Sequence, residues 1–131
     1  EAFSNWPEVI AAGASGRVVD LKPATQYVAE IVLRSTWANT DFLAIRIPEE
    51  YRSLVKLHGH AIIDGTDYVV ALGMDVIGAA VGLGDTLEEA KAQALEVAES
   101  LQGHELEFDE HGLDELDETI EKGRDYGITW E

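Results

Sequence analysis

The chain has 131 residues, of which 46% are hydrophobic and only 3 are proline, so it has the composition of one globular domain and not of a disordered segment. Its 26 acidic residues outnumber its 9 basic residues, and the formal net charge of -17 excludes nucleic acid and anionic membrane surfaces as expected partners. No cysteine is present, which excludes a disulfide framework, a thiolate nucleophile and a cysteine-based zinc site.

No part of the sequence predicts a membrane span or a signal peptide. The longest apolar stretch, residues 69–81, is interrupted by Gly73, Asp75 and Gly78 and is shorter than the roughly 20 residues that a membrane-spanning helix needs. The chain opens at Glu1 instead of Met and lacks a basic or apolar leader, so we expect further sequence upstream. Together with the absence of cysteine, these features favour a cytoplasmic protein.

The first predicted element is a helix that begins at Asn5. Asn5 can cap it, Pro7 is tolerated in the first turn, and Glu8 stands three residues after the cap. Gly16 is expected to end the helix, and residues 17–25 to connect it to the first strand. We therefore predict an N-terminal helix and linker over residues 1–25 and one α+β domain over residues 26–131.

Two strands are predicted next. Residues 27–33 are rich in β-branched and aromatic side chains, and the unbroken apolar run at residues 31–33 predicts a strand whose two faces are both at least partly covered. Residues 42–47 predict a second strand, which Pro48 ends because proline cannot donate a hydrogen bond to a sheet. A short helical turn is expected over residues 49–54.

Four further strands are predicted to form a mostly antiparallel meander. They cover residues 55–58, 61–63, 68–72 and 75–81, where apolar and β-branched residues concentrate. Asp64 and Gly65 are the expected tight turn of a hairpin.

The clearest predicted element is a long amphipathic helix after residue 86. Thr86 and Glu89 form a capping-box pattern, and Gly103 is placed to end the helix. Its apolar residues recur at helical spacing, namely Leu87, Ala90, Ala94, Val97, Ala98 and Leu101. This apolar face is expected to pack against the preceding strands.

The rest of the chain predicts smaller elements. Residues 106–108 are expected to form an edge strand, and residues 126–130 a last strand. Between them, Leu113, Leu116 and Ile120 mark a second helix with a solvated acidic face. The predicted fold class is α+β, a mostly antiparallel sheet packed against one long amphipathic helix and shorter flanking helices.

Gly82, Gly84, Asp85 and Thr86 stand between a predicted strand and a predicted helix, where free amide groups can hold a phosphate. The third glycine of a dinucleotide fingerprint and the Gly-Lys-Ser/Thr of a P-loop are both missing. Asp85 places a carboxylate where the phosphate would sit, and Thr86 can cap the same amide groups. We interpret the segment as a turn and a helix cap, with phosphate binding as the less favoured interpretation.

His58 and His60 would lie on one face of an extended segment, at a spacing that suits two ligands of one metal ion. A third ligand, Asp64 or Asp67, depends on the geometry of the hairpin. Two ligands do not close a site, so ordinary polar positions are favoured, and a small metalloenzyme remains a third hypothesis.

Other candidate sites find no support in the sequence. Asp109, His111 and Gly112 do not match the ligand spacing of a calcium loop, and His104 only flanks the same acidic segment. No Gly-X-Ser-X-Gly elbow indicates a catalytic serine, and no functional carboxylate pair can be chosen among the acidic residues. We therefore assign no catalytic, cofactor-binding or metal-binding residue.

The run VIGAAVGLGDTLEEA at residues 76–90 resembles the C-terminal domain of ATP-grasp ligases of the phosphoribosylamine-glycine ligase (glycinamide ribonucleotide synthetase) type. In that family a strand of small and apolar residues leads into a Gly-X-Thr turn and a helix that opens with an acidic residue and alanine. NWPEVI at residues 5–10, with Gly16, is similar to the helix and linker that leave the ATP-grasp domain. RDYG at residues 124–127 is similar to the family's terminal Arg-X-Asp-Ile-Gly segment.

The resemblance implies an antiparallel sheet on helices, seated against an upstream ATP-grasp domain of the same polypeptide and helping to enclose its cleft. ATP and magnesium are the cofactors implied for the parent enzyme, whose residues for both lie upstream of the matching region. The family's Gly-Gly-Tyr-Pro segment has no match after Leu33, where residues 34–37 read RSTW, so glycine and phosphoribosylamine are not carried over as substrates. Alone, the chain is not expected to hydrolyse ATP.

The leading hypothesis is therefore a C-terminal accessory domain of an ATP-dependent carboxylate-amine ligase. In such an enzyme an acyl phosphate forms on a carboxylate and an amine displaces the phosphate. The alternative is a non-enzymatic protein-binding or assembly module that uses an exposed strand edge or a tryptophan patch. The sequence also leaves open whether the chain forms a homo-oligomer. The tryptophans, expected in the core or in an interface, are Trp6, Trp37 and Trp130.

Overall fold

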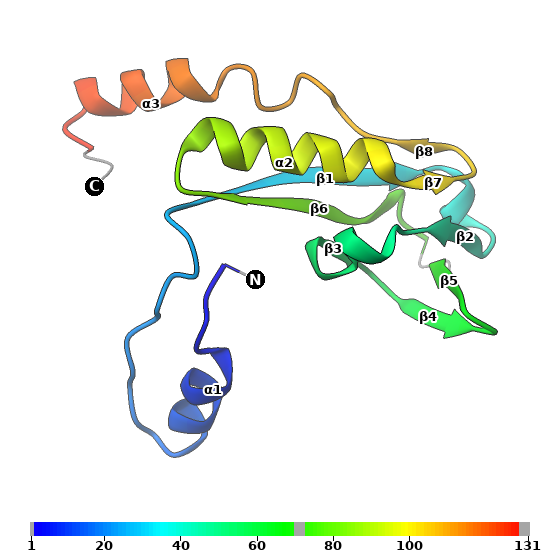
Figure 1. Ribbon diagram of the computed structural model, residues 1–131, viewed down its shortest axis with the longest axis horizontal. Helices are drawn as coiled ribbons and strands as arrows, with labels where there is room; N and C mark the ends of the chain where they lie inside the picture. Colours follow the sequence, from blue (N-terminus) through cyan, green and yellow to red (C-terminus); the bar gives the residue numbers. More distant parts are fainter. Residues whose placement is uncertain (1, 70–72, 129–131) are drawn as a thin grey trace.

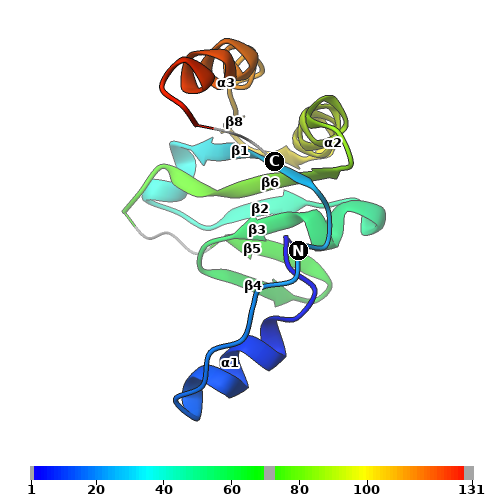
Figure 2. The ribbon, with the colours of Figure 1, turned by 90° about the vertical axis from the view of Figure 1, so that its left-hand side faces the viewer.

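The computed structural model describes residues 2–69 and 73–128 as an α+β fold. The elements in chain order are α1 (Trp6–Ala14), β1 (Tyr27–Ser35), η1 (Trp37–Asn39), β2 (Leu43–Arg46), η2 (Glu49–Leu54), β3 (Val55–Leu57), β4 (His60–Ile63), β5 (Thr66–Val69), β6 (Val76–Gly84), α2 (Leu87–Ser100), β7 (Gln102–Gly103), β8 (Leu106–Glu107) and α3 (Leu116–Asp125). Helix α2 lies along β6 and β1, with α3 on the same side of these strands and α1 on the opposite side (Figures 1 and 2). The predicted fold class is confirmed.

The strands form two antiparallel four-stranded sheets, and the prediction of one meander was wrong. The first sheet has the order β3-β6-β1-β8, and the second has the order β4-β5-β2-β7. The sheets separate at the turn formed by His58 and Gly59, because β3 pairs with β6 while β4 pairs with β5. Gly59 adopts a φ of 54° at this point, a backbone conformation that glycine adopts without strain.

Strand β1 is buried on one face and partly covered on the other, which agrees with the prediction of at least partial cover on both faces. Its side chains alternate between buried and exposed from Val28 onward. Ile31 and Leu33 face the core, whereas Val28 and Val32 are 43% and 40% exposed. The two faces of the strand are thus covered to different extents, with the residues that face the core buried and the two valines on the other face only partly covered.

The core joins α2 to both sheets. Residues far apart in the sequence meet in one cluster, among them Leu33, Leu43, Ile45, Val69, Ile77 and Val97. The predicted Asp-Gly hairpin is confirmed: Ile63 pairs with Thr66, and Asp64 and Gly65 have φ values of 51° and 78°.

Helix α2 and strand β6 pack very closely against each other. A Cβ atom built at Gly82 would lie 2.0 Å from the carbonyl oxygen of Ala90 and 2.4 Å from the amide nitrogen of Ala94. A Cβ atom at Gly84 would lie 2.6 Å from the amide nitrogen of Ala90. Ala90 and Ala94 are themselves fully buried. The backbone of the helix therefore rests directly on the backbone of the strand.

Two predicted boundaries near α2 need correction. Strand β6 continues through Gly82 to Gly84, which still pair with β1, so the turn begins only at Asp85. At the other end, α2 ends at Ser100. Gly103 does not end the helix; it belongs to β7 and pairs with Ile45 of β2. In both places a backbone partner in a sheet decides the conformation that the glycine adopts.

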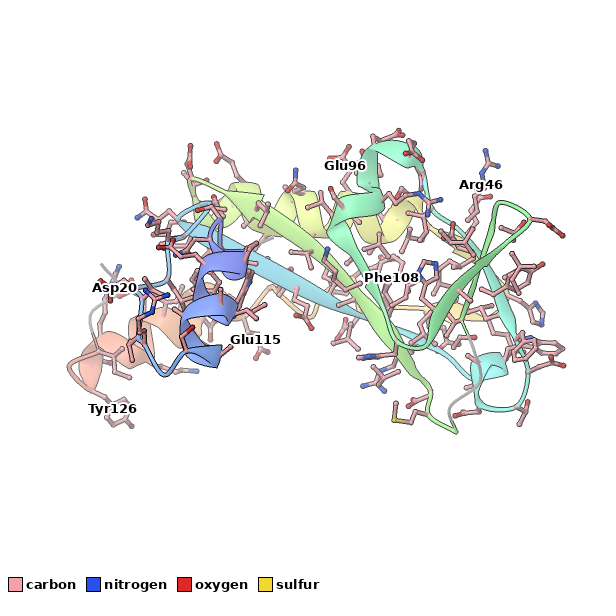
Figure 3. All side chains as sticks on the ribbon, turned by 90° about the horizontal axis from the view of Figure 1, so that it is seen from below. Asp20, Arg46, Glu96, Phe108, Glu115 and Tyr126 are labelled. Carbon is pink, nitrogen blue, oxygen red and sulfur yellow. The ribbon has the colours of Figure 1, made fainter. Side chains whose placement is uncertain are left out.

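The smaller C-terminal elements largely follow the prediction. The edge strand appears as β8 and the acidic helix as α3, which begins at Leu116. The expected last strand is not seen at residues 126–128, where Tyr126 and Gly127 form a turn, and residues 129–130 lie outside the described residues. Tyr126 projects into solvent at the end of α3 (Figure 3).

Residues 2–24 form a loop that closes on itself, which we call the N-terminal arm. Helix α1 is confirmed, but Asn5 makes no side-chain cap. Asn5 is buried, donates a hydrogen bond to the carbonyl oxygen of Asp20 at 2.9 Å and accepts one from the amide of Lys22 at 2.9 Å. A bridge between Phe3 and Pro23 closes the same loop. The side chain of Asn5 thus binds the backbone of the linker after α1 and does not cap the backbone amides at the start of α1.

Within residues 2–69 and 73–128, no helix combines the length and the apolar character needed to cross a membrane.

Replacing Gly82 by alanine is expected to lower the free energy of unfolding by about 3 kcal/mol or more, because the new methyl group meets helix backbone that cannot rotate away. Urea unfolding followed by circular dichroism measures this loss.

Gly13→Ala is the matched control. Nothing lies within 4 Å of a Cβ atom at Gly13, which is in α1 and has no positive φ. This variant should leave stability unchanged or raise it slightly, since alanine favours a helix over glycine by about 1 kcal/mol. An equal loss in both variants would show that α2 does not rest on β6 at Gly82.

Candidate functional site

A large cavity lies between the start of β1, the first turn of α2 and helix α3. Its volume is about 820 Å³, and Tyr27, Thr86 and Ile120 are among its lining residues. Lys122 and Arg124 are its basic residues among those described, while its acidic residues are Asp85, Glu88, Asp117, Glu118, Glu121 and Asp125. Such a cavity repels a phosphate group and favours cationic or neutral groups.

The start of α2 has the predicted capping box. Thr86 Oγ1 accepts a hydrogen bond from the amide of Glu89 at 3.2 Å. Glu89 Oε2 accepts hydrogen bonds from the amides of Asp85 at 2.9 Å and Thr86 at 3.2 Å. These amide groups are therefore occupied by the chain's own side chains, and the turn-and-cap interpretation is confirmed.

The structure does not bring His58 and His60 together as the pair of metal ligands that the sequence analysis weighed and did not favour. His58 lies in the turn after β3 and His60 lies in β4, so the two residues are not on one face of an extended segment. Asp67, the predicted alternative for a third ligand, is engaged with other groups, and Asp64 lies in the hairpin turn. Among the described residues, no group of three or more histidine, aspartate or glutamate side chains is placed to hold a metal ion.

Asp67 instead forms a cluster with Arg52 and His60, whose side chains are 35% and 30% exposed. Asp67 itself is buried, at 3% exposure, and its carboxylate accepts two hydrogen bonds from Arg52, each 2.8 Å long. His60 Nε2 lies 2.7 Å from Oδ1 of the same carboxylate. The cluster connects η2 to the hairpin of β4 and β5.

The negative charge of Asp67 is paired with the positive charge of Arg52. The guanidinium of Arg52, and after it the ring of His60, lower the pKa of Asp67, although burial opposes this shift. Asp67 in turn raises the pKa of Arg52. A buried carboxylate with a two-pronged arginine partner is the arrangement in which a buried charge is tolerated.

Chemically, the cluster orients the His60 ring through the carboxylate of Asp67. Its evident role is to fasten the hairpin. The sequence analysis did not single out Arg52, although β5 carries a usable signal. In that strand Asp67 and Val69 are buried while Thr66 is exposed, so an aspartate falls on the inward face and requires a cationic partner.

Asp67→Asn is expected to lower the free energy of unfolding at neutral pH by roughly 2 kcal/mol, because the buried side chain loses its two charge-assisted hydrogen bonds from Arg52. The pKa of Asp67 is lowered on folding, so its contribution is present above the ordinary value of 3.8 and is lost as pH falls through the lowered value. The difference between wild type and variant should therefore shrink with acidification. Urea unfolding from pH 7 to pH 2.5 measures it.

Asp64→Asn is the control on the same hairpin. Asp64 is exposed in the turn with a φ of 51°, which asparagine also tolerates. Its stability should match wild type throughout. If Asp67→Asn showed the same small effect at every pH, the carboxylate would not be paired as described.

The remaining candidates are dispersed over the surface. His111 pairs with Asp114 at 2.9 Å, and its amide donates to Asp109, so the acidic loop is held by its own side chains. His104 packs edge-on against Trp37, with ring centroids 4.8 Å apart. Trp6 and Trp37 are 45% and 39% exposed and lie outside the core. Trp130 lies outside the described residues.

Comparisons with known proteins show a similar fold in a solved structure but do not assign the chain to a family. No family model matches the sequence, and no curated protein matches it. The architecture is one found in part of a ligase. The solved structure of phosphoribosylamine-glycine ligase from Thermotoga maritima is similar over 82% of this chain, with a TM-score of 0.63.

That similarity is one of fold alone, since the sequences are 22% identical. The chain spans 27% of the length of the Thermotoga maritima enzyme, about a quarter. Any activity, substrate or partner of the whole ligase is therefore a matter for proposal.

Proposed function

We propose that the chain is the C-terminal accessory domain of an ATP-dependent carboxylate-amine ligase related to phosphoribosylamine-glycine ligase. The observation that carries the proposal is the similarity of 82% of the chain to a quarter of such an enzyme. The resemblance at residues 76–90 supports it, because that run forms β6, the tight turn and the start of α2. The segment that resembles the family is thus also the segment where strand and helix pack most closely.

The surface of the N-terminal arm supports the proposal that another domain packs beside this one. The arm holds itself closed through Asn5 and carries several exposed apolar side chains, which are Trp6, Ile10, Val18 and Leu21. Figure 1 shows α1 below β1 and β6, on the side away from α2, and Figure 3 shows the same helix from below, in front of the strands. Exposed apolar surface of this kind suits contact with another domain. In this proposal the upstream ATP-grasp domain packs against the arm.

The division of labour follows from what the described residues offer. The amides of Asp85, Thr86 and Glu89 are capped, and the cavity beside them is acidic, so neither suits a nucleotide phosphate. ATP and magnesium are bound upstream, where the acyl phosphate forms and the amine displaces phosphate. The present domain supplies packing surface and part of the wall of the cleft.

The 131-residue chain is expected not to bind magnesium-ATP in isothermal titration calorimetry. The protein extended by the sequence encoded upstream should bind magnesium-ATP, and it should turn ATP over continuously to ADP and phosphate only when a carboxylate and an amine are both supplied, since the carboxylate alone supports a single acyl phosphate and a single ADP per enzyme. Tight magnesium-ATP binding by the 131 residues alone would contradict the division of labour. So would a natural start near Glu1 with no ATP-grasp domain before it.

Ile10→Asp tests the role of the arm. Ile10 is 66% exposed, so the change should leave the melting temperature of the 131-residue chain unaltered. In the extended protein it should lower ligase turnover about tenfold by weakening the contact between the domains. Ile63→Asp, at an exposed position on the β4–β5 hairpin, is the control and should change neither quantity. Equal turnover in both variants would remove the arm from the interface.

A further inference from the structure

Strand β1 has an open outer edge. One side of the strand pairs with β6 from Tyr27 to Arg34. On the other side, β8 pairs only with Arg34 and Ser35. Among residues 2–69 and 73–128, no further strand pairs with β1, so the edge from Val28 to Val32 is free along its length.

The backbone of three β1 residues faces this edge. In β6, the amide of Leu83 donates to the side chain of Gln93 and the carbonyl of Ile77 accepts from the amide of His58, so both point away from β1. The backbone amide and carbonyl groups of the odd-numbered residues of β6 therefore point toward β3, and those of the even-numbered residues point toward β1. The partners of the odd residues 79, 81 and 83 are Val32, Glu30 and Val28, whose amide and carbonyl groups point outward.

Space for another chain lies beside the edge. A cavity of about 420 Å³ is lined by Glu30 and Val32 on one side and by Phe108, Asp109 and Leu113 on the other. The 820 Å³ cavity reaches the same strand at Tyr27. The C-terminal segment thus runs near β1 without filling the position of a neighbouring strand.

The side chains at this edge define what the additional strand must carry. Val28 and Val32 are exposed apolar residues on one face of the sheet, and the carboxylate of Glu30 lies between them. Side chains directly opposite on neighbouring strands contact one another, so apolar groups suit both valines and a basic group suits Glu30.

We propose that the outer edge of β1 binds an extended peptide with the pattern apolar-X-basic-X-apolar, which adds to the first sheet as a strand beside β1. Main-chain hydrogen bonds to residues 28, 30 and 32 provide the affinity, and the side chains of the pattern provide the selectivity. The pattern reads the same in both directions, so it applies to either strand orientation.

The electrostatics favour a basic peptide over a second copy of this chain. The net charge is -17, and Glu107 and Asp109 add carboxylates beside Glu30 along the smaller cavity. Two copies paired through β1 would bring these carboxylates together, at a cost in repulsion. A lysine or arginine in the peptide is attracted by the same charges.

The direct test uses a fluorescein-labelled peptide, Thr-Val-Thr-Lys-Thr-Val-Thr with blocked ends, titrated with the 131-residue chain and followed by fluorescence anisotropy. Binding should saturate, weaken with added salt, and fall about tenfold when the peptide lysine is replaced by glutamate. Equal affinity for the two peptides, or no saturable binding of the lysine peptide, would overturn the proposal.

Variants of the chain separate strand pairing from general charge attraction. Glu30→Pro removes one outward amide and leaves the hydrogen bonds to β6 in place, so it should abolish binding while the melting curve remains cooperative. Glu30→Lys should reverse the preference in favour of the glutamate peptide. Glu50→Lys makes the same change of charge at exposed Glu50 in η2, which adjoins β3 at the opposite edge, and should keep the original preference.

Peptide chemistry provides the same test if Glu30→Pro does not fold. In a peptide added as a strand, alternate amides face β1. N-methylation of one alternate set should abolish binding, and N-methylation of the other set should not. Equal effects of both sets, or a dimer in sedimentation that peptide fails to displace, would contradict peptide pairing at this edge.

Discussion

The structure depends on the backbone contact between α2 and β6. At Gly82 and Gly84 there is no room for a side chain, because the backbone of α2 occupies that space at Ala90 and Ala94. Small residues on both elements let the helix lie at this distance, and close packing of this kind tolerates no added volume. The capping box at Thr86 fixes where the helix begins, so the strand, the turn and the helix form one rigid unit.

Several features of the molecule follow from this unit. Once β6 is held under α2, β1 and β3 pair on its two sides, and one face of β1 turns into the core. The second sheet packs against the same core through residues such as Leu43 and Val69. The parts left outside are the N-terminal arm, the outer edge of β1 and helix α3. These are the surfaces that a neighbouring domain or a bound peptide can use.

Local signals in the sequence predicted the local structure. The capping box of Thr86, the Asp-Gly hairpin turn and the spacing of apolar residues in α2 each depend on residues a few positions apart, and each is confirmed. Non-local choices were not predictable in the same way. Whether Gly82 belongs to a turn or to a strand depends on β1, more than fifty residues away. Likewise, Asn5 has the chemistry of a helix cap but finds its partners at Asp20 and Lys22.

In the candidate site, too, local contacts were predictable from the sequence and non-local contacts were not. The choice of a cap over a phosphate cradle was available from Asp85 and Thr86 themselves. The pairing of Asp67 with Arg52 was not, because it requires η2 and β5 to meet. The resemblance to a ligase domain agreed with the observed fold, while the division into an N-terminal helix and linker (residues 1–25) and one domain (residues 26–131) and the role of the upstream sequence stay predictions.

Native-state hydrogen exchange along β1, measured residue by residue by NMR, tests the arrangement most directly. The amides of Ala29, Ile31 and Leu33 face β6 and should exchange only on global unfolding. Those of Val28, Glu30 and Val32 face the open edge and should exchange orders of magnitude faster. Fast exchange at Ala29 and Ile31 would contradict the account of β1 and β6 as one rigid unit held by α2, and uniform protection along the strand would contradict the open edge of β1.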